Sequence, residues 1–253
     1  MKERIVSELE RIERERNVSI LLAVESGSRA WGFASPDSDY DVRFVYVHRR
    51  DWYLSVLEPR DVIEEMLPGD LDVSGWELRK ALRLFAKCNL ALNEWLGSPV
   101  TYRADLSFRE QLTNLIPRHF NPIAGTHHYR KMAKRALEDN YRDGHIGIKK
   151  VFYVMRPLFA CRWIANTGTQ PPTAFADLVS ASWVNDDERH WVAELQRLKT
   201  HAFEAQLIEL DASRAQKLRA EIARYEVAAG SRSAAEKPSL SDLDGILREW
   251  VTA

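Results

Sequence analysis

The chain has little of several features that would assign a protein to a special class. Its two cysteines, Cys88 and Cys161, lie far apart and show no paired metal-ligand spacing, so we expect neither a disulfide framework nor a structural zinc site. No apolar stretch is long enough to span a bilayer, and the charged first residues lack the apolar segment of a secretory signal. We therefore predict a cytoplasmic protein with no membrane partner.

The chain also lacks an excess of either charge. It has 36 Lys and Arg against 37 Asp and Glu, a net charge of -1, and 45% hydrophobic residues in 253. Such a composition is typical of an ordinary globular protein with one large or two small domains. A neutral balance argues against a protein that wraps long nucleic acid through a general basic surface, and leaves a short end or hairpin open as a partner.

The first part of the chain is predicted to contain strands. Residues 20–24 form a short apolar run that stops at Ser26-Gly27-Ser28, and residues 40–47 are rich in aromatic and β-branched side chains. A further strand pair is predicted at residues 62–65 and 71–74, separated by the turn signal Pro68-Gly69-Asp70. An amphipathic helix is expected before these strands, on the spacing of Ile5, Leu9 and Ile12.

The later part of the chain is predicted to be helical. Helical spacing begins at residue 77 and dominates beyond residue 107, in the segments 129–137, 147–164, 188–208 and 212–228. We therefore predict an α/β (α+β) fold with an N-terminal catalytic domain at 1–105 and a helical domain at 106–227 that closes a cleft. Residues 228–253 are predicted to form a linker, at 228–237, and a last helix, at 240–250.

The residues that indicate chemistry are Gly27-Ser28 and Asp39-Tyr40-Asp41. Side chains alternate along a strand, so Asp39 and Asp41 at its start are expected on one face, where their like charges favour a bound cation. Hard carboxylate oxygens suit Mg²⁺, which commonly binds together with substrate phosphates. Gly27-Ser28 at the end of a buried strand is expected to make a tight turn whose N–H groups face phosphate. Each feature is weak alone, because Asp is also common in turns.

Their ordered combination resembles the signature of the DNA polymerase beta-like nucleotidyltransferase superfamily: Gly-Ser, about ten residues, then Asp-x-Asp. A closer resemblance covers most of the chain and points to the predicted nucleotidyltransferases of bacterial RNA-repair pathways. The segments that carry it are 27–33, 38–44, 72–77, 93–96 with 98–100, and 149–157. The resemblance implies a polymerase-beta-like fold and transfer of a nucleotidyl group from a nucleoside triphosphate (NTP, ATP among them).

The superfamily also implies a third carboxylate on a later strand. Asp72 occupies the matching place, and Asp70 is the alternative, although it fits the turn with Pro68-Gly69 better. By resemblance, Asp39 and Asp41 hold two Mg²⁺ or Mn²⁺ ions, and Asp72 binds beside one of them and orients the attacking hydroxyl. The metals would stabilise an in-line displacement at the α-phosphorus, with pyrophosphate leaving.

Basic residues are expected to contact the triphosphate. Lys149, Tyr153 and Arg156 lie on one stripe of a later helix, and related enzymes place a Lys and a Tyr there. Whether Lys149 or Lys150 faces the nucleotide is not decided by spacing, and Arg29 beside the Gly-Ser turn is a further nucleotide-binding candidate. Trp31 is expected either to stack on a base or to pack in the core.

Three functional hypotheses follow. The first is a nucleotidyltransferase acting on an RNA or DNA 3′ end, and the second is nucleotidylation of a protein or small molecule. The third is a catalytically silent nucleotide-binding module, against which the presence of all three candidate carboxylates argues.

Overall fold

A computed structural model describes residues 1–200, 206–230 and 238–252. The chain divides into two compact units. Unit 1 comprises Met1–Ala30, Asp39–His119 and the described part of Lys237–Ala253. Unit 2 comprises Trp31–Ser38 and the described part of Phe120–Glu236. The chain therefore enters unit 2 briefly at Trp31 before it returns to finish unit 1.

Unit 1 is built on a five-stranded mixed sheet with the order β3-β4-β2-β1-β5. Strands β2 and β4 are parallel, and the other neighbouring pairs are antiparallel. The strands are β1 (Val18–Glu25), β2 (Tyr40–His48), β3 (Val62–Leu67), β4 (Leu71–Glu77) and β5 (Thr101–Ala104). The central strand β1 is buried on both faces, which explains its continuous apolar sequence.

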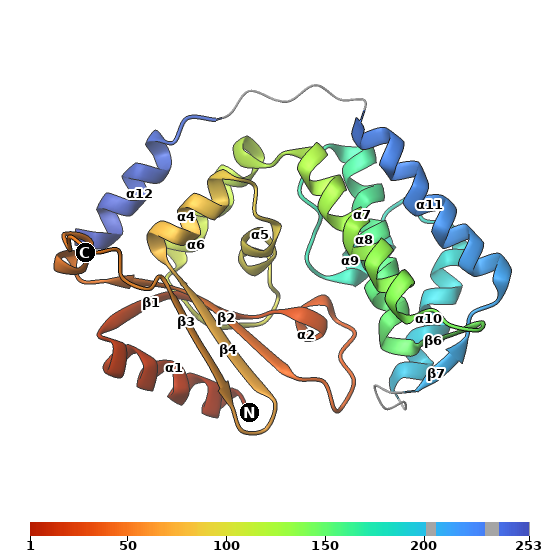
Figure 1. Ribbon diagram of the computed structural model, residues 1–253, viewed down its shortest axis with the longest axis horizontal. Helices are drawn as coiled ribbons and strands as arrows, with labels where there is room; N and C mark the ends of the chain where they lie inside the picture. Colours follow the sequence, from red (N-terminus) through yellow and green to blue (C-terminus); the bar gives the residue numbers. More distant parts are fainter. Residues whose placement is uncertain (201–205, 231–237, 253) are drawn as a thin grey trace. The chain divides into compact units, whose positions relative to one another are not determined.

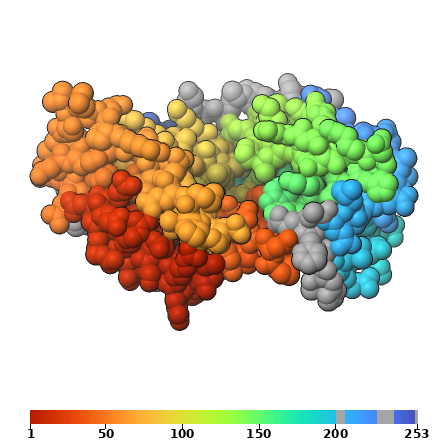
Figure 2. All heavy atoms as spheres, turned by 60° about the horizontal axis from the view of Figure 1, so that its bottom comes forward, coloured from red at the N-terminus to blue at the C-terminus, as the bar shows by residue number. Residues whose placement is uncertain are grey.

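One face of this sheet is covered by α1 (Lys2–Arg16). Ile5, Leu9 and Ile12 are each at most 1% exposed and pack against alternate residues of β2 and β4. The helix also contacts the β3–β4 hairpin, because Arg11 pairs with Glu65, and Figure 2 shows the red helix against the orange atoms of that hairpin. The predicted amphipathic first helix is therefore confirmed as a covering element.

The other face of the sheet is covered by helices from two of the three stretches of unit 1 (Figure 1). The short α3 (Arg50–Tyr53) follows β2, and the helices in this core are α4 (Leu78–Ala86), α5 (Leu90–Leu96), α6 (Leu106–His119) and α12 (Ser241–Thr252). Glu77 caps α4 by accepting hydrogen bonds from the N–H groups of Arg79 and Lys80. The last helix is thus an integral part of unit 1.

Unit 2 is mainly helical. Helices α7 and α8 lie side by side (Figure 1), and α8 is buried on most of its faces. Its elements are α7 (Pro122–Asn140), β6 (His145–Gly147), α8 (Ile148–Thr167), α9 (Phe175–Ser180), α10 (Asp186–Thr200), β7 (Leu207–Glu209) and α11 (Ala212–Gly230). None of the helices in the described residues of either unit combines the length and apolarity needed to cross a bilayer.

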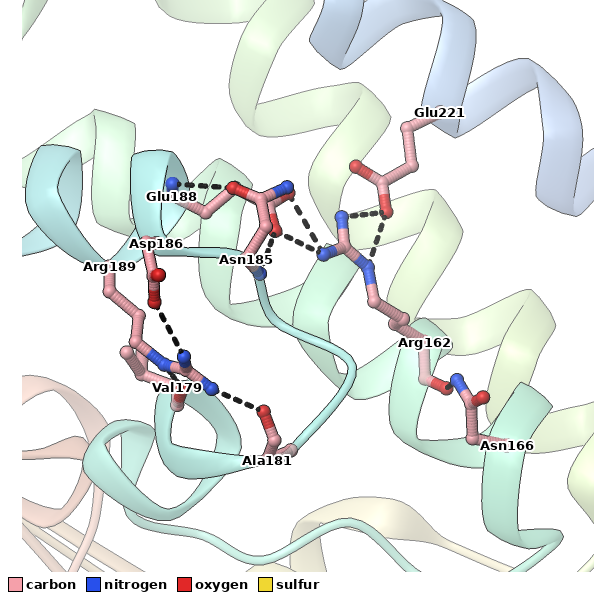
Figure 3. A network of polar contacts seen from close by, with 9 residues as sticks. All are labelled: Arg162, Asn166, Val179, Ala181, Asn185, Asp186, Glu188, Arg189 and Glu221. Carbon is pink, nitrogen blue, oxygen red and sulfur yellow. Dashed lines mark hydrogen bonds and ion pairs between the residues drawn. The ribbon is translucent and has the colours of Figure 1, made fainter.

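Three helices of unit 2 meet at a partly buried arginine (Figure 3). Arg162 on α8 donates to both carboxylate oxygens of Glu188 on α10, at 2.9 and 2.8 Å. It also donates to Glu221 on α11, at 2.7 Å from Nη2. Burial raises the pKa of the Glu221 carboxyl above its usual range, and the Arg162 charge opposes that rise. The three side chains, 17 to 26% exposed, form one charge network that joins α8, α10 and α11.

The loop Trp31–Ser38 is packed into unit 2 by aromatic side chains. The Phe33 ring stacks on Phe152, with centroids 5.1 Å apart, and the Trp31 ring meets Tyr153 edge to face at 5.3 Å. The buried Lys199 donates a hydrogen bond to the Phe33 carbonyl. The loop that follows the Gly-Ser turn is therefore held by the interior of the helical unit.

The predicted α/β class and its order, strands first and helices later, are confirmed. The helix expected over 188–208 ends at Thr200, however, and Leu207–Glu209 forms β7 against β6. Strands β5 and β6 were also not predicted. Strands β5, β6 and β7 have only three or four residues each, too few to show a clear alternation.

The two units differ from the predicted division at 105/106. Helix α6 belongs to unit 1, because Phe108 and Leu112 pack in its core, so the chain passes into unit 2 only after His119. Helix α11 continues through Gly230, into the segment predicted as a linker, and 231–237 lie outside the described residues.

Candidate active site

Two of the predicted carboxylates face each other across neighbouring strands. In the parallel pairing of β2 and β4, Asp41 lies directly opposite Asp72. Their neighbours Val42 and Val73 point into the core under α1, so the two carboxylates lie on the opposite face of the sheet. Asp41 and Asp72 side chains are 30 and 33% exposed. The sheet thus presents a pair of partly exposed carboxylates.

A guanidinium group lies between these carboxylates. Arg43, two residues after Asp41 on β2, donates from Nη2 to Asp41 Oδ1 at 3.0 Å and to Asp72 Oδ2 at 2.6 Å. Its Nη1 donates to the carbonyls of Val42 and Asp72, both at 3.1 Å. One positive charge therefore already neutralises part of the repulsion between the two acids.

The predicted Gly-Ser turn lies against Asp41 of this pair. Gly27 begins the short α2 (Gly27–Trp31) with φ +59°, and a Cβ built on it would collide with the Asp41 carboxylate, whose Cγ would be only 3.2 Å away. Ser26 N–H donates to the Asp41 carbonyl at 2.8 Å, and Ser28 is 4% exposed. Only glycine combines this backbone conformation with so close an approach to Asp41.

Replacing Gly27 by alanine is expected to lower by about a hundredfold the nucleotidyl transfer that the sequence resemblance implies, because the new Cβ displaces Asp41. The left-handed conformation adds a loss of stability of about 1–2 kcal/mol. The measurement compares initial rates of label transfer with unfolding free energies. Gly168→Ala is the matched control, since Gly168 lies in unit 2, has φ +69°, and has open space where the added Cβ would lie. Equal transfer rates in the two variants would contradict the expected displacement.

A buried acid that was not predicted from the sequence, Glu25, binds the backbone of Asp41 beside this turn. Glu25, the last residue of β1, is 1% exposed, accepts a hydrogen bond from the Asp41 N–H at 2.7 Å, and accepts another from the Tyr102 hydroxyl. Burial raises the pKa of the Glu25 carboxyl. Ser98 donates to the Glu25 carbonyl at 2.7 Å. The available signal was a charged residue at the end of an otherwise apolar strand.

The remaining predicted carboxylate, Asp39, does not form a group of three with Asp41 and Asp72. It is exposed, one residue before β2, and its carbonyl accepts from Arg29 Nε at 3.0 Å. The Arg29 guanidinium stacks on the Tyr40 ring at 3.7 Å, beside the Gly-Ser turn. Within the described residues, no three His, Cys, Asp or Glu side chains are close enough together to hold a metal ion.

The geometry also distinguishes Asp72 from Asp70. Asp70 lies in the β3–β4 turn with φ 55°, and its carbonyl accepts from the Tyr40 N–H at 2.8 Å. Asp72 is the residue in register with Asp41. The donor chemistry of the pair fits a hard cation, because two carboxylates already surround a positive group there. The roles of these residues stay predictions.

The remaining candidates lie on α8 in unit 2. Lys149 is partly buried, and Lys150 is exposed with its Nζ 5.4 Å from the Tyr153 ring centroid. Arg156 differs from the prediction: it is fully buried, lies 4.4 Å over the Trp31 ring, and donates to the Thr173 carbonyl at 3.1 Å. This geometry makes Arg156 an anchor inside unit 2 and does not expose it to a nucleotide. Trp31, 8% exposed, is likewise a core residue.

Comparisons with known proteins agree with the predicted resemblance. The model of RlaP, the RNA repair pathway DNA polymerase beta family, matches residues 1–249. "Uncharacterized protein YcgL" of Bacillus subtilis (strain 168) is 44% identical over 254 residues, which cover 99% of this chain and 96% of that protein.

A solved structure, that of a nucleotidyltransferase-like protein from Exiguobacterium sibiricum 255-15, aligns over 97% of this chain and 80% of that chain. It is 12% identical with a TM-score of 0.30, values too low to support an inference about this chain. The family match and the Bacillus relative both extend over nearly the whole chain. The resemblance seen in the sequence is confirmed, and the chain belongs to the RNA repair pathway DNA polymerase beta family.

Proposed function

We propose that this chain is a metal-dependent nucleotidyltransferase that moves a nucleoside monophosphate from an NTP to the 3′ hydroxyl of an RNA and releases pyrophosphate. The single observation that carries the proposal is the placement of Asp41 opposite Asp72, with the Gly27 turn packed directly against Asp41. A carboxylate pair that can hold divalent metal ions, beside a turn whose N–H groups can face phosphate, is an arrangement suited to phosphoryl transfer. The family, whose description includes a DNA polymerase beta and an RNA repair pathway, supports the same reaction.

Each residue has a role in this proposal. Asp41 and Asp72 would hold Mg²⁺ or Mn²⁺, which supplies charge neutralisation for the attacking and leaving oxygens, and Asp39 of the preceding loop is the candidate third ligand. Asp72 orients the attacking hydroxyl. In the step, the acceptor oxygen bonds to the α-phosphorus, the bond from this phosphorus to the bridging oxygen breaks, and the hydroxyl proton passes to Asp72 or water.

The phosphates of the NTP are assigned to basic and backbone groups. The N–H groups that follow Gly27, the Ser28 hydroxyl and Arg29 are the contacts proposed in unit 1. On α8, Lys149 or Lys150 is the proposed cation for the triphosphate, with Tyr153 beside it. Arg156 is left out of this set because its guanidinium is buried.

An RNA end is favoured as acceptor by the description of the family. The net charge of -1 fits a short contact with one end of an RNA better than a long basic groove. Modification of a protein or small molecule becomes a distinct outcome of the test.

The test incubates the full chain with each α-labelled NTP, Mg²⁺ or Mn²⁺, and an RNA that ends in a 3′ hydroxyl. The matched control is the same RNA with a 3′ phosphate, which removes the attacking group and leaves the rest of the acceptor unchanged. We expect label and released pyrophosphate only with the free hydroxyl. Label on added cell protein or metabolites, with none on RNA, would overturn the acceptor assignment. No transfer to any acceptor, with NTP binding intact, would support the silent nucleotide-binding module instead.

A further inference from the structure

The Arg43 guanidinium occupies the position between the two carboxylates where a cation is expected. Its Nη2 is shared by Asp41 and Asp72, and its Nη1 is shared by two backbone carbonyls. The Arg43 side chain is 20% exposed, less than either acid. Four acceptors therefore fix the position of the Arg43 guanidinium between the two carboxylates.

The charges of this group make it a competitor of a metal ion. Two facing carboxylates carry two negative charges, and the positive charge of Arg43 neutralises one of them. A divalent ion bound by the same oxygens would lie next to the guanidinium, and like charges at such a separation repel each other even at an effective dielectric constant of about 20. The Arg43 guanidinium and a divalent metal ion therefore compete for the position between the two carboxylates.

We infer that Arg43 is a positioning residue: it holds Asp41 and Asp72 together in the metal-free protein and is displaced from between them when a divalent metal ion binds. The inference rests on the proposed function, because it takes these two carboxylates as metal ligands. It adds a residue to the site for which the superfamily signature, Gly-Ser and Asp-x-Asp, gives no role.

The surface beside the pair offers the displaced guanidinium a place. A hollow of about 320 Å³ is lined by Arg43, Asp72 and Ser74 together with Glu64 of β3. In the β3–β4 register, Glu64 lies opposite Ser74, and so its carboxylate is on the same face of the sheet as Asp72. Glu64 accepts a hydrogen bond from Arg60 at 2.8 Å and its side chain is 60% exposed, so the hollow would offer the displaced guanidinium water and the field of a nearby carboxylate.

Arg43→Gln is expected to differ from the wild type in two measurable properties. Without metal, the variant should unfold at a lower temperature than the wild type, because the two carboxylates then repel each other. With metal, it should bind more tightly, since the ion no longer displaces a cation. A residue with a merely structural role would lower stability by the same amount with and without metal and would not tighten metal binding.

The experiment titrates the full chain with Mn²⁺ alone, followed by calorimetry and by electron paramagnetic resonance, in the wild type and in Arg43→Gln. We expect the dissociation constant for Mn²⁺ to fall by about tenfold in the variant. The difference in melting temperature from the wild type should shrink at saturating Mn²⁺. Arg11→Gln is the matched control, because Arg11 also bridges several carboxylates, Glu8, Glu15 and Glu65, under the opposite face of the sheet. It should leave Mn²⁺ affinity unchanged.

Arg43→Lys keeps the test decisive if Arg43→Gln does not fold. Lysine retains one positive charge but lacks the planar fork that spans two carboxylates, so its Mn²⁺ affinity should lie between those of the wild type and Arg43→Gln. Equal or weaker Mn²⁺ binding by the folded Arg43 variants, or no Mn²⁺ binding by any form, would overturn the inference. The proposed function fails by a separate result, the absence of label transfer by the wild type.

Discussion

Asp41→Asn and Asp72→Asn are each expected to lower nucleotidyl transfer by at least about a thousandfold, the scale on which removal of a metal-binding or charge-stabilising group acts. Each change removes one negative charge and keeps the shape of the side chain. The amide oxygen can still accept from Arg43, so the fold of the sheet should be retained. The measurement is the single-turnover rate of label transfer at saturating NTP, with circular dichroism as the check on folding.

The matched control for this loss is Asp70→Asn, two residues before Asp72. Asp70 is exposed and has φ 55°, a conformation that asparagine also adopts readily. Its transfer rate should stay within about twofold of the wild type, as expected for a surface substitution. A loss at Asp70 with normal transfer by Asp72→Asn would exchange the two assignments. Asp39→Asn belongs to the same series, and a loss as large as that at Asp41 would show that the loop before β2 supplies a third ligand.

The sequence was informative where short-range rules apply. The apolar run that ends at Ser26-Gly27-Ser28 became β1 followed by a glycine with positive φ, and Asp39-Tyr40-Asp41 led directly into β2. Period-two alternation placed Asp41 on one face, away from Val42. These features depend on neighbours in the chain, and neighbours are what a single sequence records.

The pairing of distant strands was beyond such rules. That Asp72, and not Asp70, faces Asp41 depends on a parallel register between strands about thirty residues apart. The hydrogen bonds of Glu25 to Asp41 and Tyr102 depend on the same sheet order. The resemblance to a known superfamily suggested Asp72, and the turn signal Pro68-Gly69 favoured it over Asp70, but neither gave the register that places Asp72 opposite Asp41.

Helical spacing predicted that Arg156 would face a nucleotide, but its side chain is fully buried, again because of contacts with distant segments. A stripe with Lys149, Tyr153 and Arg156 faces solvent only where no other element covers that side of the helix. Helix α8 is buried on most sides, so the same stripe runs from a partly exposed Lys149 to a fully buried Arg156. The Trp31 ring and the Thr173 carbonyl that receive this guanidinium come from segments far from it in the sequence.

Arg162→Met is expected to reduce the free energy of unfolding by about 3–5 kcal/mol, because removal of one partner leaves buried charge uncompensated. Glu188 and Glu221 both lose the guanidinium that joins α8 to α10 and α11 (Figure 3). The measurement is urea unfolding of the variant and the wild type. Arg135→Met is the matched control: its partner Asp139 is one turn away on α7, the arginine is 86% exposed, and such surface pairs contribute at most about 1 kcal/mol.

The loss in Arg162→Met should also depend on pH. Burial already raises the pKa of Glu221 in the folded protein, and without Arg162 nothing of that strength lowers it. A carboxyl whose folded pKa lies above its unfolded value stabilises the fold below the unfolded pKa, and this contribution is lost as pH rises through the folded pKa. The difference between Arg162→Met and the wild type should therefore be larger at pH 8 than at pH 5, and Glu221→Gln in the Arg162→Met background should remove much of that dependence. A pH-independent difference no larger than that of Arg135→Met would show that the network at Arg162 does not hold the three helices together.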